Sequence, residues 1–593
     1  MSQPTDIRRG QVITTFGPGA IVATPSGESY MITSNSRWVY EQPGKFIIME
    51  ERLRRRLNVK ELRFPPPIDE KRTKDNKSFR GKDAIKSVRF PAWHHCRYCS
   101  RMHWIGSFAE MAKCTCEHGR DEKKQGLIPV RFVAACLNGH IEDFPFQEWV
   151  HKGENPRNHE LYYHTGTSGS LGGIVIRCNT CGVSRSMESA LSKGVLTKTK
   201  GCSGLRPWLG LKNSNQSCSE TLVGAQRGAS NIYFPQVISS IYIPERDAAV
   251  SPKVKSFFQK QKGFFEMIMG NNPDDFNRFA ELMIEQAKLD SETQAVLEYV
   301  KSELTRQETV QVSEEDFRFA EYDVLRTLAG VPDDDYSARQ LSAQEYSSPV
   351  RDYFNKITLV EKLRETRVFA GFTRLKPEAN SSLTETIRFA NNSNEWLPAD
   401  IIRGEGIFLD FSADRIAAWE SNTDVRNRAN VILRNYSDSI GAKSYFTDNS
   451  DPVLILLHTL AHLLISEISL QCGYGNSSLR ERIYYSRQHK MTGILIYTAS
   501  GDAEGSLGGL VRQGKPGRLE PIIASALEKA RWCSSDPVCS SVGVQGPFGT
   551  NLAACHNCSI LPETSCELFN NLLDRGLVVG TPERPELGFF QNI

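Results

Sequence analysis

Short apolar runs separated by turn residues mark the amino-terminal part of the chain as β-rich. Residues 11–16, 20–24 and 30–33 are apolar and β-branched, and Gly-Pro-Gly and Pro-Ser-Gly turns separate them. Runs of this length bounded by turn residues are typical of strands. The sequence therefore predicts three short strands in this part of the chain.

The pattern becomes helical further along the chain. Between residues 276 and 304 apolar side chains such as Phe279, Leu282 and Met283 follow a helical spacing. Residues 452–465 form a near-continuous apolar run whose length predicts a buried helix, and 521–531 predict another helix. Apolar runs at 407–411 and 494–497 predict buried strands. We therefore expect a helical middle domain and a carboxy-terminal α/β domain.

These changes of pattern predict several domains in an α+β multidomain protein. At roughly 100–200 residues per domain, 593 residues correspond to about three to five domains. The expected segments are a β-rich part with a basic stretch at 1–90, zinc-ribbon-like modules at 91–150 and 151–250, a helical domain and linker at 251–350, a mixed α/β segment at 351–450 and a carboxy-terminal zinc domain at 451–593.

Composition is that of an ordinary soluble protein, with 39% hydrophobic and 24% charged residues. The amino terminus lacks a secretory signal pattern, and we expect no apolar run of the roughly 18–20 residues that a membrane span requires. A cytoplasmic protein without membrane contact is therefore expected. In that reducing compartment the fifteen cysteines are expected to bind metal instead of forming disulfides.

Spacing groups the cysteines into structural zinc sites, because a Cys-x2-Cys turn presents two thiolates to one ion and a distant pair completes the tetrahedron. The first predicted site consists of Cys96, Cys99, Cys114 and Cys116. Cys136 and His140 form another possible knuckle, which could replace one half of that site. The second predicted site consists of Cys178, Cys181, Cys202 and Cys218. Together with the third group described next, these sites predict two to three structural zinc ions.

The third predicted site has five candidate ligands for four places. Cys555-x2-Cys558 forms one side, Cys566 returns after a proline-containing turn, and either Cys539 or Cys533 supplies the fourth thiolate. Cys539 is favoured because Asp536-Pro537 lets the chain turn just before it, whereas Cys533 can simply end the preceding helix.

A strongly basic stretch runs from Arg52 to Arg89, with fourteen Lys and Arg residues against five acidic ones. Such a stretch is suited to contact phosphates, because each neutralised phosphate releases condensed counterions. The alternative is a solvated loop. The candidate nucleic-acid contacts are Arg52, Arg54, Arg55, Arg56, Lys71, Arg72, Lys74, Lys77 and Arg80.

Two motifs resemble catalytic sites but lack a required group. His458 and His462 stand four residues apart, as in helix-borne zinc proteases, yet position 459 is threonine instead of the catalytic glutamate. Residues 509–516 nearly match a phosphate-binding loop, but Pro516 stands where a hydroxyl should bind magnesium. We therefore expect neither metal catalysis nor ATP hydrolysis.

Three longer strings resemble one known family. They are RRGQVITTFGPGAIV at 8–22, RFV at 131–133 continuing to GHIEDFP at 139–145, and NLAACHNC at 551–558 continuing to LPETSC at 561–566. Together they resemble the DrmB family, the non-catalytic partner in the bacterial anti-phage defence system DISARM. The strings lie near both ends and in the middle, so the resemblance spans most of the chain.

The resemblance implies a complex with DrmA, a large helicase-like ATPase that engages DNA with single-stranded ends. It also implies that residues from about 450 onward are similar to a domain found at the tail of other helicases. There a four-cysteine zinc cluster follows an α/β core, which matches Cys539, Cys555, Cys558 and Cys566. This sequence departs from the pattern by offering Cys533 as well.

The expected function is that of a non-catalytic, zinc-stabilised scaffold that partners the ATPase and assists DNA binding. One alternative is a metal-dependent nuclease or hydrolase that uses His458, His462 and an acid such as Glu467 or Asp502. A second alternative is a zinc-ribbon transcription-type regulator that reads DNA sequence.

Overall fold

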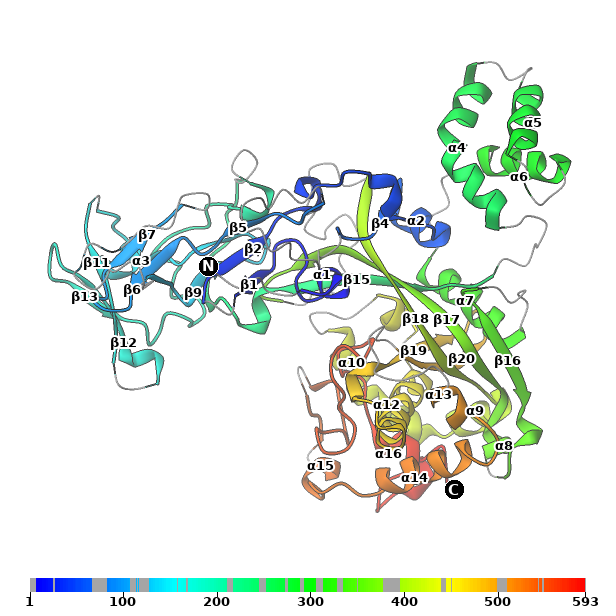
Figure 1. The fold of residues 1–593 in the computed structure, drawn as a ribbon. Helices are drawn as coiled ribbons and strands as arrows, with labels where there is room; N and C mark the ends of the chain where they lie inside the picture. The colour runs from blue at the N-terminus through cyan, green and yellow to red at the C-terminus, as the bar shows by residue number, and fades with distance from the viewer. Residues whose placement is uncertain are drawn as a thin grey trace. The chain divides into compact units, whose positions relative to one another are not determined.

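The fold is taken from a computed structural model of the chain (Figure 1). The structure describes residues 7–591, with gaps at 25–26, 67–82, 107–113, 115, 117–126, 157, 167–168, 211–216, 245–251, 272–275, 288, 290–292, 306–312, 328–333, 349, 377–394, 439–443, 450, 499–508, 542 and 547–548.

The chain divides into two compact units, and neither is continuous in sequence. Unit 1 contains Met1–Ser240, Thr366–Ile402 and Ser437–Ser444, and unit 2 contains Ile241–Glu365, Arg403–Tyr436 and Tyr445–Ile593. Three of the boundaries fall within strands β15 (Phe234–Ile241), β17 (Phe354–Thr373) and β18 (Trp396–Phe411), and the other two fall in the helices at 423–437 and 444–448. The expected segment 351–450 is therefore shared between the two units.

Unit 1 contains many short antiparallel strands, which agrees with the β-rich amino-terminal part that the sequence predicts. Four three-stranded sheets have the orders β1-β2-β5, β7-β6-β8, β10-β9-β14 and β11-β12-β13. Their strands are β1 (Ile21–Ala23), β2 (Ser29–Ile32), β5 (Ser87–Arg89), β6 (Trp93–Cys96), β7 (Met102–Trp104), β8 (Leu127–Pro129), β9 (Phe132–Ala135), β10 (Ile141–Asp143), β11 (Leu161–Thr165), β12 (Ile174–Cys178), β13 (Ser184–Ser186) and β14 (Val223–Gln226).

The two expected zinc modules of unit 1 share one hydrophobic core. Phe144 and Trp149, around the short helix α3 (Phe146–Val150), pack in the same cluster as Tyr163 of β11 and Ile176 of β12. Strands this short bury little apolar surface alone. Residues 91–150 and 151–250 therefore stabilise one another.

The first expected strand is wrong, because residues 11–16 begin within helix α1 (Arg9–Ile13). The Gln11 side chain accepts a hydrogen bond from the backbone N–H of Arg8 at 2.9 Å, which closes the first turn. Val12 and Ile13 are buried on its inner face. Capping and burial here outweigh the strand preference of the β-branched residues. The next two expected strands are present as β1 and β2.

One large sheet carries the rest of the β structure. Its order is β15-β17-β18-β20-β19, with β16 paired to β17, and with β4 paired to β18 and to β3. The strands not yet given are β3 (Ile47–Ile48), β4 (Glu61–Arg63), β16 (Ser337–Ser342), β19 (Leu479–Ser486) and β20 (Met491–Thr498). The strands predicted at 407–411 and 494–497 lie within β18 and β20 and are buried there.

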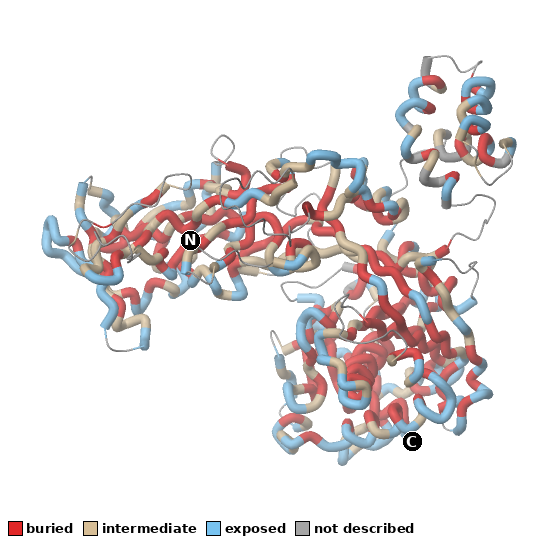
Figure 2. Tube along the Cα trace, in the orientation of Figure 1, coloured by how far each residue is buried: buried red, intermediate tan, exposed pale blue. Residues whose placement is uncertain are grey.

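Helix α12 (Pro452–Cys472) lies in the buried interior of unit 2 (Figure 2). It contacts β19, β20, α14 (Leu519–Ala530) and α16 (Arg575–Val579). Asp451 caps its first turn by accepting from the backbone N–H of Val453, and Gly473 ends it in a left-handed conformation. At 21 residues the helix exceeds the length that the sequence indicated and is apolar enough to cross a membrane. However, 89% of its most apolar window is buried inside the protein, as in a core helix.

The remaining helices include the helical part of unit 2. The predicted helical region contains α4 (Pro252–Asn271), α5 (Phe276–Gln286) and α6 (Thr293–Thr305), which share a core that includes Phe258, Phe265 and Val296. The other helices are α2 (Glu51–Leu57), α7 (Glu314–Thr327), α8 (Val350–Tyr353), α9 (Ala413–Glu420), α10 (Thr423–Ser437), α11 (Ser444–Asp448), α13 (Gly509–Gln513) and α15 (Val538–Ser541).

Candidate metal centres

All fifteen cysteines lie within the described residues, and none of them forms a disulfide. Fourteen of them fall into five groups of four residues, in which one potential ligand atom from each residue lies within 4.8 Å of the others. Cys472, at the end of α12, is the remaining cysteine. One of these groups is a predicted ligand set, and the others differ from the predicted sets.

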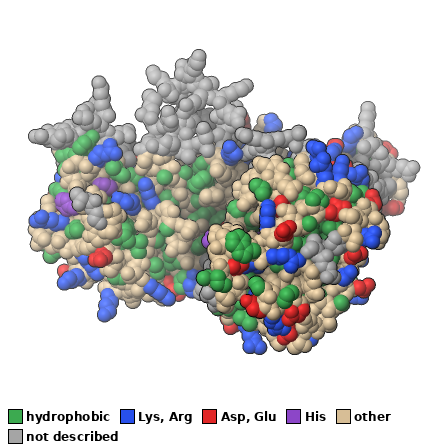
Figure 3. Space-filling view, turned by 90° about the horizontal axis from the view of Figure 1, so that it is seen from below, with side chains coloured by type: hydrophobic (Ala, Val, Ile, Leu, Met, Phe, Trp, Pro, Cys, Tyr) green, Lys and Arg blue, Asp and Glu red, His purple; other side chains and the backbone are tan. Residues whose placement is uncertain are grey.

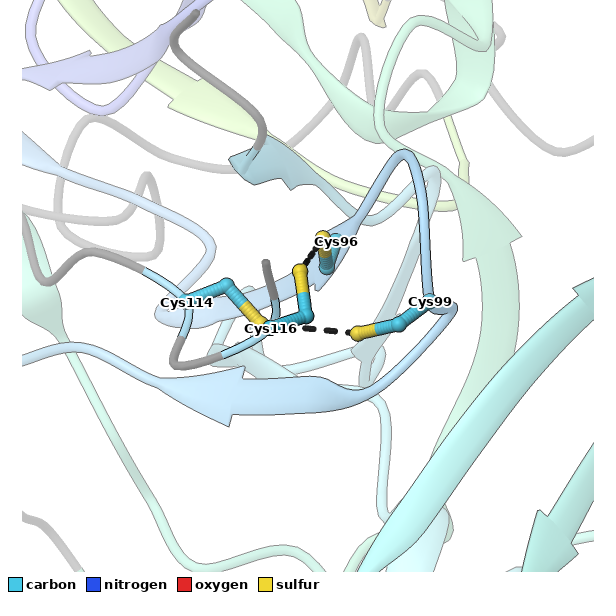
Figure 4. A group of neighbouring side chains, drawn as sticks. All are labelled: Cys96, Cys99, Cys114 and Cys116. Atoms are coloured by element: carbon cyan, nitrogen blue, oxygen red, sulfur yellow. Dashed lines mark hydrogen bonds between the residues drawn. The ribbon is translucent and has the colours of Figure 1, made fainter. Parts of the chain in front are cut away.

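The first predicted group comes together as expected. Cys96 ends β6 and Cys99 follows in the turn to β7, opposite Cys114 and Cys116 (Figure 4). The Sγ atoms of Cys96 and Cys116 are 3.7 Å apart, and those of Cys99 and Cys114 are 3.5 Å apart. Sulfurs bonded tetrahedrally to one zinc at about 2.3 Å lie about 3.8 Å from each other. The four thiols therefore fit one zinc ion, whose binding stays a prediction.

The second predicted group is divided between two places. Cys178 and Cys181 lie beside two histidines that the sequence did not single out, His151 and His159. Nδ1 of His159 is 3.4 Å from Sγ of Cys178, and Nε2 of His151 is 3.4 Å from Sγ of Cys181.

Strand pairing explains this arrangement. Leu161 of β11 pairs with Cys178 of β12, which places His159 beside the Cys178 knuckle. His151 follows the end of α3, and its Nδ1 donates to the carbonyl of Gln147 at 2.8 Å, so that Nε2 faces the sulfurs. The two histidines that precede β11 in the sequence, His151 and His159, were the available signal for this site.

The other half of the second predicted group, Cys202 and Cys218, lies with Cys136 and His140. Nδ1 of His140 lies 3.4 Å from Sγ of Cys136 and 3.7 Å from Sγ of Cys202. The Cys136–His140 knuckle, which the sequence weighed for the first site, lies in the turn between β9 and β10. Pairing of β14 with β9 brings Cys218 close, and the backbone N–H of Ile141 donates to Leu205, which brings the Cys202 loop close.

Arg374 holds the Cys136–His140 turn in place. Its buried guanidinium donates to the carbonyls of Gly139, Ile232 and Gly19 at 3.0, 2.7 and 2.8 Å. Lysine has no fork of donors and cannot reach all three carbonyls. We expect Arg374→Lys to lower the free energy of unfolding by about 2–3 kcal/mol, because buried carbonyls lose their partner. Chemical denaturation of the two proteins measures this, and an unchanged midpoint would contradict it.

The carboxy-terminal cysteine cluster contains both of the competing cysteines. Cys533 and Cys539 lie with Cys555 and Cys558, with Sγ–Sγ distances of 3.5 Å for Cys533–Cys555 and 3.8 Å for Cys539–Cys558. The sequence predicted only one of these two cysteines as a ligand, with Cys566 as another. The structure instead places both in the group and leaves Cys566 out.

The turn that carries Cys533 and Cys539 explains the correction. The carboxylate of Asp536 accepts from the backbone N–H of Cys533 at 2.8 Å and from Arg575 at 2.6 Å. This turn directs both sulfurs toward the Cys555 knuckle.

Cys566 belongs instead to a fifth group with His458, His462 and Glu481. The acids of the nuclease alternative do not take part within the described residues. Glu467 is bound by Lys529 at 2.6 Å and by Gln471 at 2.9 Å, and Asp502 lies outside the part of the chain that the structure describes.

Backbone N–H groups favour thiolates in these clusters. Burial opposes ionisation of Cys178, but the backbone N–H of Cys181 and other donors lower its pKa to about 6. Burial likewise opposes ionisation of Cys555, yet the N–H of Asn557 gives a net decrease in its pKa. Burial and the neighbouring sulfur of Cys558 raise the pKa of Cys539. A mixed set of thiols and thiolates becomes fully ionised when a metal ion displaces the remaining protons.

Residues 52–66 and 83–89 of the basic stretch are described. Arg52, Arg54, Arg55 and Arg56 lie in helix α2, where they are half-buried or exposed. Arg54 and Arg55 bind Glu51 at 2.5 and 2.7 Å. Burial opposes ionisation of Glu51, but the two guanidinium groups lower its pKa to about 2. The candidates Lys71, Arg72, Lys74, Lys77 and Arg80 lie outside the described residues. On the face drawn in Figure 3, Lys and Arg side chains are spread among acidic ones.

The near match to a phosphate-binding loop is occupied by a carboxylate of the chain itself. Glu405 accepts hydrogen bonds from the backbone N–H groups of Leu510 and Val511, at the start of α13, at 2.8 and 3.2 Å. These are the kind of N–H groups that such a loop offers to phosphate. A phosphate at this helix start would have to displace Glu405.

Comparisons with known proteins agree with the sequence motifs. The profile of the MrfA Zn-binding domain matches residues 460–559, and that of a domain of unknown function, DUF8724, matches residues 8–234. The DISARM protein DrmB of Bacillus paralicheniformis is 31% identical over 529 residues, which cover 86% of this chain and 91% of that protein. The resemblance indicated by the motifs is confirmed, and the chain belongs to the DrmB family of DISARM proteins.

Proposed function

We propose that the chain is a non-catalytic, zinc-stabilised scaffold of an anti-phage DISARM complex in the cytoplasm. In this role it binds the helicase-like ATPase DrmA and helps hold DNA with single-stranded ends. Family membership supports the assignment to DISARM. The assignment of a structural role to this chain and of ATP turnover to its partner rests on the chemistry of the metal groups.

The observation that carries the proposal is that each metal group offers four protein ligands. An ion with four protein ligands has no open position for water or substrate, which is the arrangement of structural zinc sites. Such ions stabilise small modules whose cores are too limited to fold alone. We therefore assign the metal to folding and ATP turnover to the partner.

Co-purification tests the partnership. The tagged, zinc-loaded chain is co-expressed with a DrmA protein, and the complex is analysed by size-exclusion chromatography with a DNA-stimulated ATPase assay. We expect one complex whose ATPase activity requires DrmA, and we expect the chain alone to turn over no ATP. Folded chain that elutes without DrmA at micromolar concentration would contradict the proposal.

Salt dependence tests the DNA contact of the basic stretch. We expect Gln substitution of Arg52, Arg55 and Arg56 to weaken binding of single-stranded DNA by the complex. Each lost phosphate contact lowers the slope of log affinity against log salt by about 0.7, so three contacts lower it by about 2. Arg54 is left in place because it also donates to the carbonyl of Val59, just after the end of α2.

The matched control carries Gln at three exposed arginines of α9 and α10, namely Arg415, Arg426 and Arg434. It removes the same charge from another surface, and we expect its salt slope to equal that of the unmodified complex. If the α2 variant and the control had equal slopes of log affinity against log salt, the DNA contact would lie outside α2. Equal affinity for unrelated DNA sequences, which phosphate contacts predict, would count against a sequence-reading regulator.

The nuclease alternative is less favoured because His458 and His462 are completely buried, at 0% exposure. A hydrolytic metal needs a position that water and substrate can reach. Incubation of the purified complex with DNA and divalent ions separates the two functions. The scaffold role predicts intact DNA.

A further inference from the structure

The fifth group of potential ligands lies inside unit 2 and joins three segments that are distant in sequence. His458 and His462 occupy adjacent turns on one face of α12, Glu481 lies in β19, and Cys566 follows the 561–565 turn. These four residues are 0, 0, 1 and 4% exposed. A buried cluster with this composition requires either protons or a cation to balance it.

The histidine tautomers are fixed by backbone carbonyls. Nδ1 of His462 lies 2.7 Å from the carbonyl oxygen of Ser559, and Nδ1 of His458 lies 3.3 Å from that of Leu572. A carbonyl can only accept, so each Nδ1 carries the proton. In the neutral imidazole each Nε2 then directs a lone pair at the cluster centre, as in metal-bound histidines.

Acceptor atoms converge at that centre. Nε2 of His458 is 3.1 Å from Sγ of Cys566 and 3.1 Å from one carboxylate oxygen of Glu481, and Nε2 of His462 is 3.5 Å from the other. Nε2 of His462 and Oε2 of Glu481 are buried and have no hydrogen-bond partner. Nitrogen, oxygen and sulfur ligands of one tetrahedral zinc lie about 3.3–3.8 Å apart. The spacing is therefore close to that of a metal site.

Backbone groups hold the two anionic ligands from outside. The N–H groups of Leu568 and Asn570 lie 3.3 and 3.2 Å from Sγ of Cys566, and the N–H of Glu567 donates to Glu481 at 3.0 Å. Hydrogen bonds of this kind orient ligands and favour the thiolate. Two imidazoles, a thiolate and a carboxylate are the ligands that zinc prefers, whereas calcium and magnesium prefer oxygen alone.

We propose that His458, His462, Glu481 and Cys566 form a buried structural site for one transition-metal ion of the zinc class. It is distinct from the four-cysteine cluster of the same unit. His458 and Cys566 lie outside the residues matched by the zinc-binding-domain profile. The ion links α12, β19 and the carboxy-terminal loop, and it has no position for substrate.

Counting ions in the full-length chain tests the site. Native mass spectrometry of the folded protein gives the number of bound ions, and Glu481→Gln keeps the shape of the side chain while removing its charge. We expect this variant to carry one ion fewer than the unmodified chain. Cys472→Ser, which removes a thiol from the same helix outside the groups, should retain every ion. Folded Glu481→Gln with the full count would overturn the proposal.

A second measurement does not depend on folding of a variant. Anomalous difference maps from crystals of the unmodified chain, recorded on both sides of the zinc absorption edge, locate each zinc. We expect a peak between the four side chains, in addition to peaks at the cysteine clusters. Peaks at the cysteine clusters without one here would show a protonated ion-pair network instead of a metal site and would overturn the proposal.

Discussion

Cys558→Ser is expected to remove one zinc ion from the chain and to unfold the segment that contains residues 533–558. The Cys533–Cys539 turn is joined to the Cys555 knuckle by the sulfur cluster. Apparent binding energies of structural zinc reach about 10–16 kcal/mol in small modules, which is comparable to the stability of a whole domain. For a domain of about 150–250 residues, even a loss of about 5 kcal/mol lowers the unfolding temperature by roughly 10–20 °C.

Thermal unfolding and zinc analysis of the same samples measure this effect. Cys472→Ser is the control, because it removes a half-buried thiol that belongs to none of the metal groups. We expect the control to keep its zinc and to unfold within about 2 °C of the unmodified chain. If Cys558→Ser unfolded at the same temperature as the control, the cluster would have no structural role.

Glu321→Gln is expected to destabilise unit 2 by about 3–5 kcal/mol, the usual cost of removing one partner of a buried ion pair. The Glu321 carboxylate is completely buried and accepts from Nε and Nη2 of Arg482 at 2.6 and 3.0 Å. It also accepts from Tyr484 and from the backbone N–H of Ile241. This network joins α7 to β19, and the substitution leaves a buried guanidinium without its main counter-ion.

Denaturant unfolding compares this variant with Glu528→Gln, which makes the same chemical change at an exposed position of α14. We expect the exposed substitution to change the free energy of unfolding by less than about 0.5 kcal/mol. Similar small values for both variants would show that α7 is not held to β19 by this network.

The sequence predicted the metal groups where local spacing determines geometry. Cys96-x2-Cys99 and Cys555-x2-Cys558 are turns, so their two sulfurs face one ion regardless of the rest of the fold. The partners of a knuckle depend on strand pairing over tens of residues. Pairing of Leu161 with Cys178 is what brings His159 to that site, and no short-range pattern distinguishes this from a pairing that brings Cys202.

Two other features could not be predicted for related reasons. Glu481 is one of two charged residues buried in β19, and only the packing of that strand on α12 shows that its carboxylate meets His458 and His462. Helix α1 forms despite β-branched residues because a local cap and burial of Val12 outweigh strand preference. In both cases burial in the folded chain, which local sequence does not show, contributed to the outcome.

X-ray absorption at the zinc edge of the purified full-length chain tests the central claim most directly, namely that metal in this protein is enclosed by four protein ligands. The account predicts zinc in the folded protein with a four-coordinate shell in which sulfur outnumbers nitrogen, unchanged on addition of azide. Folded chain without zinc, or a shell with an oxygen ligand that azide replaces, would contradict it.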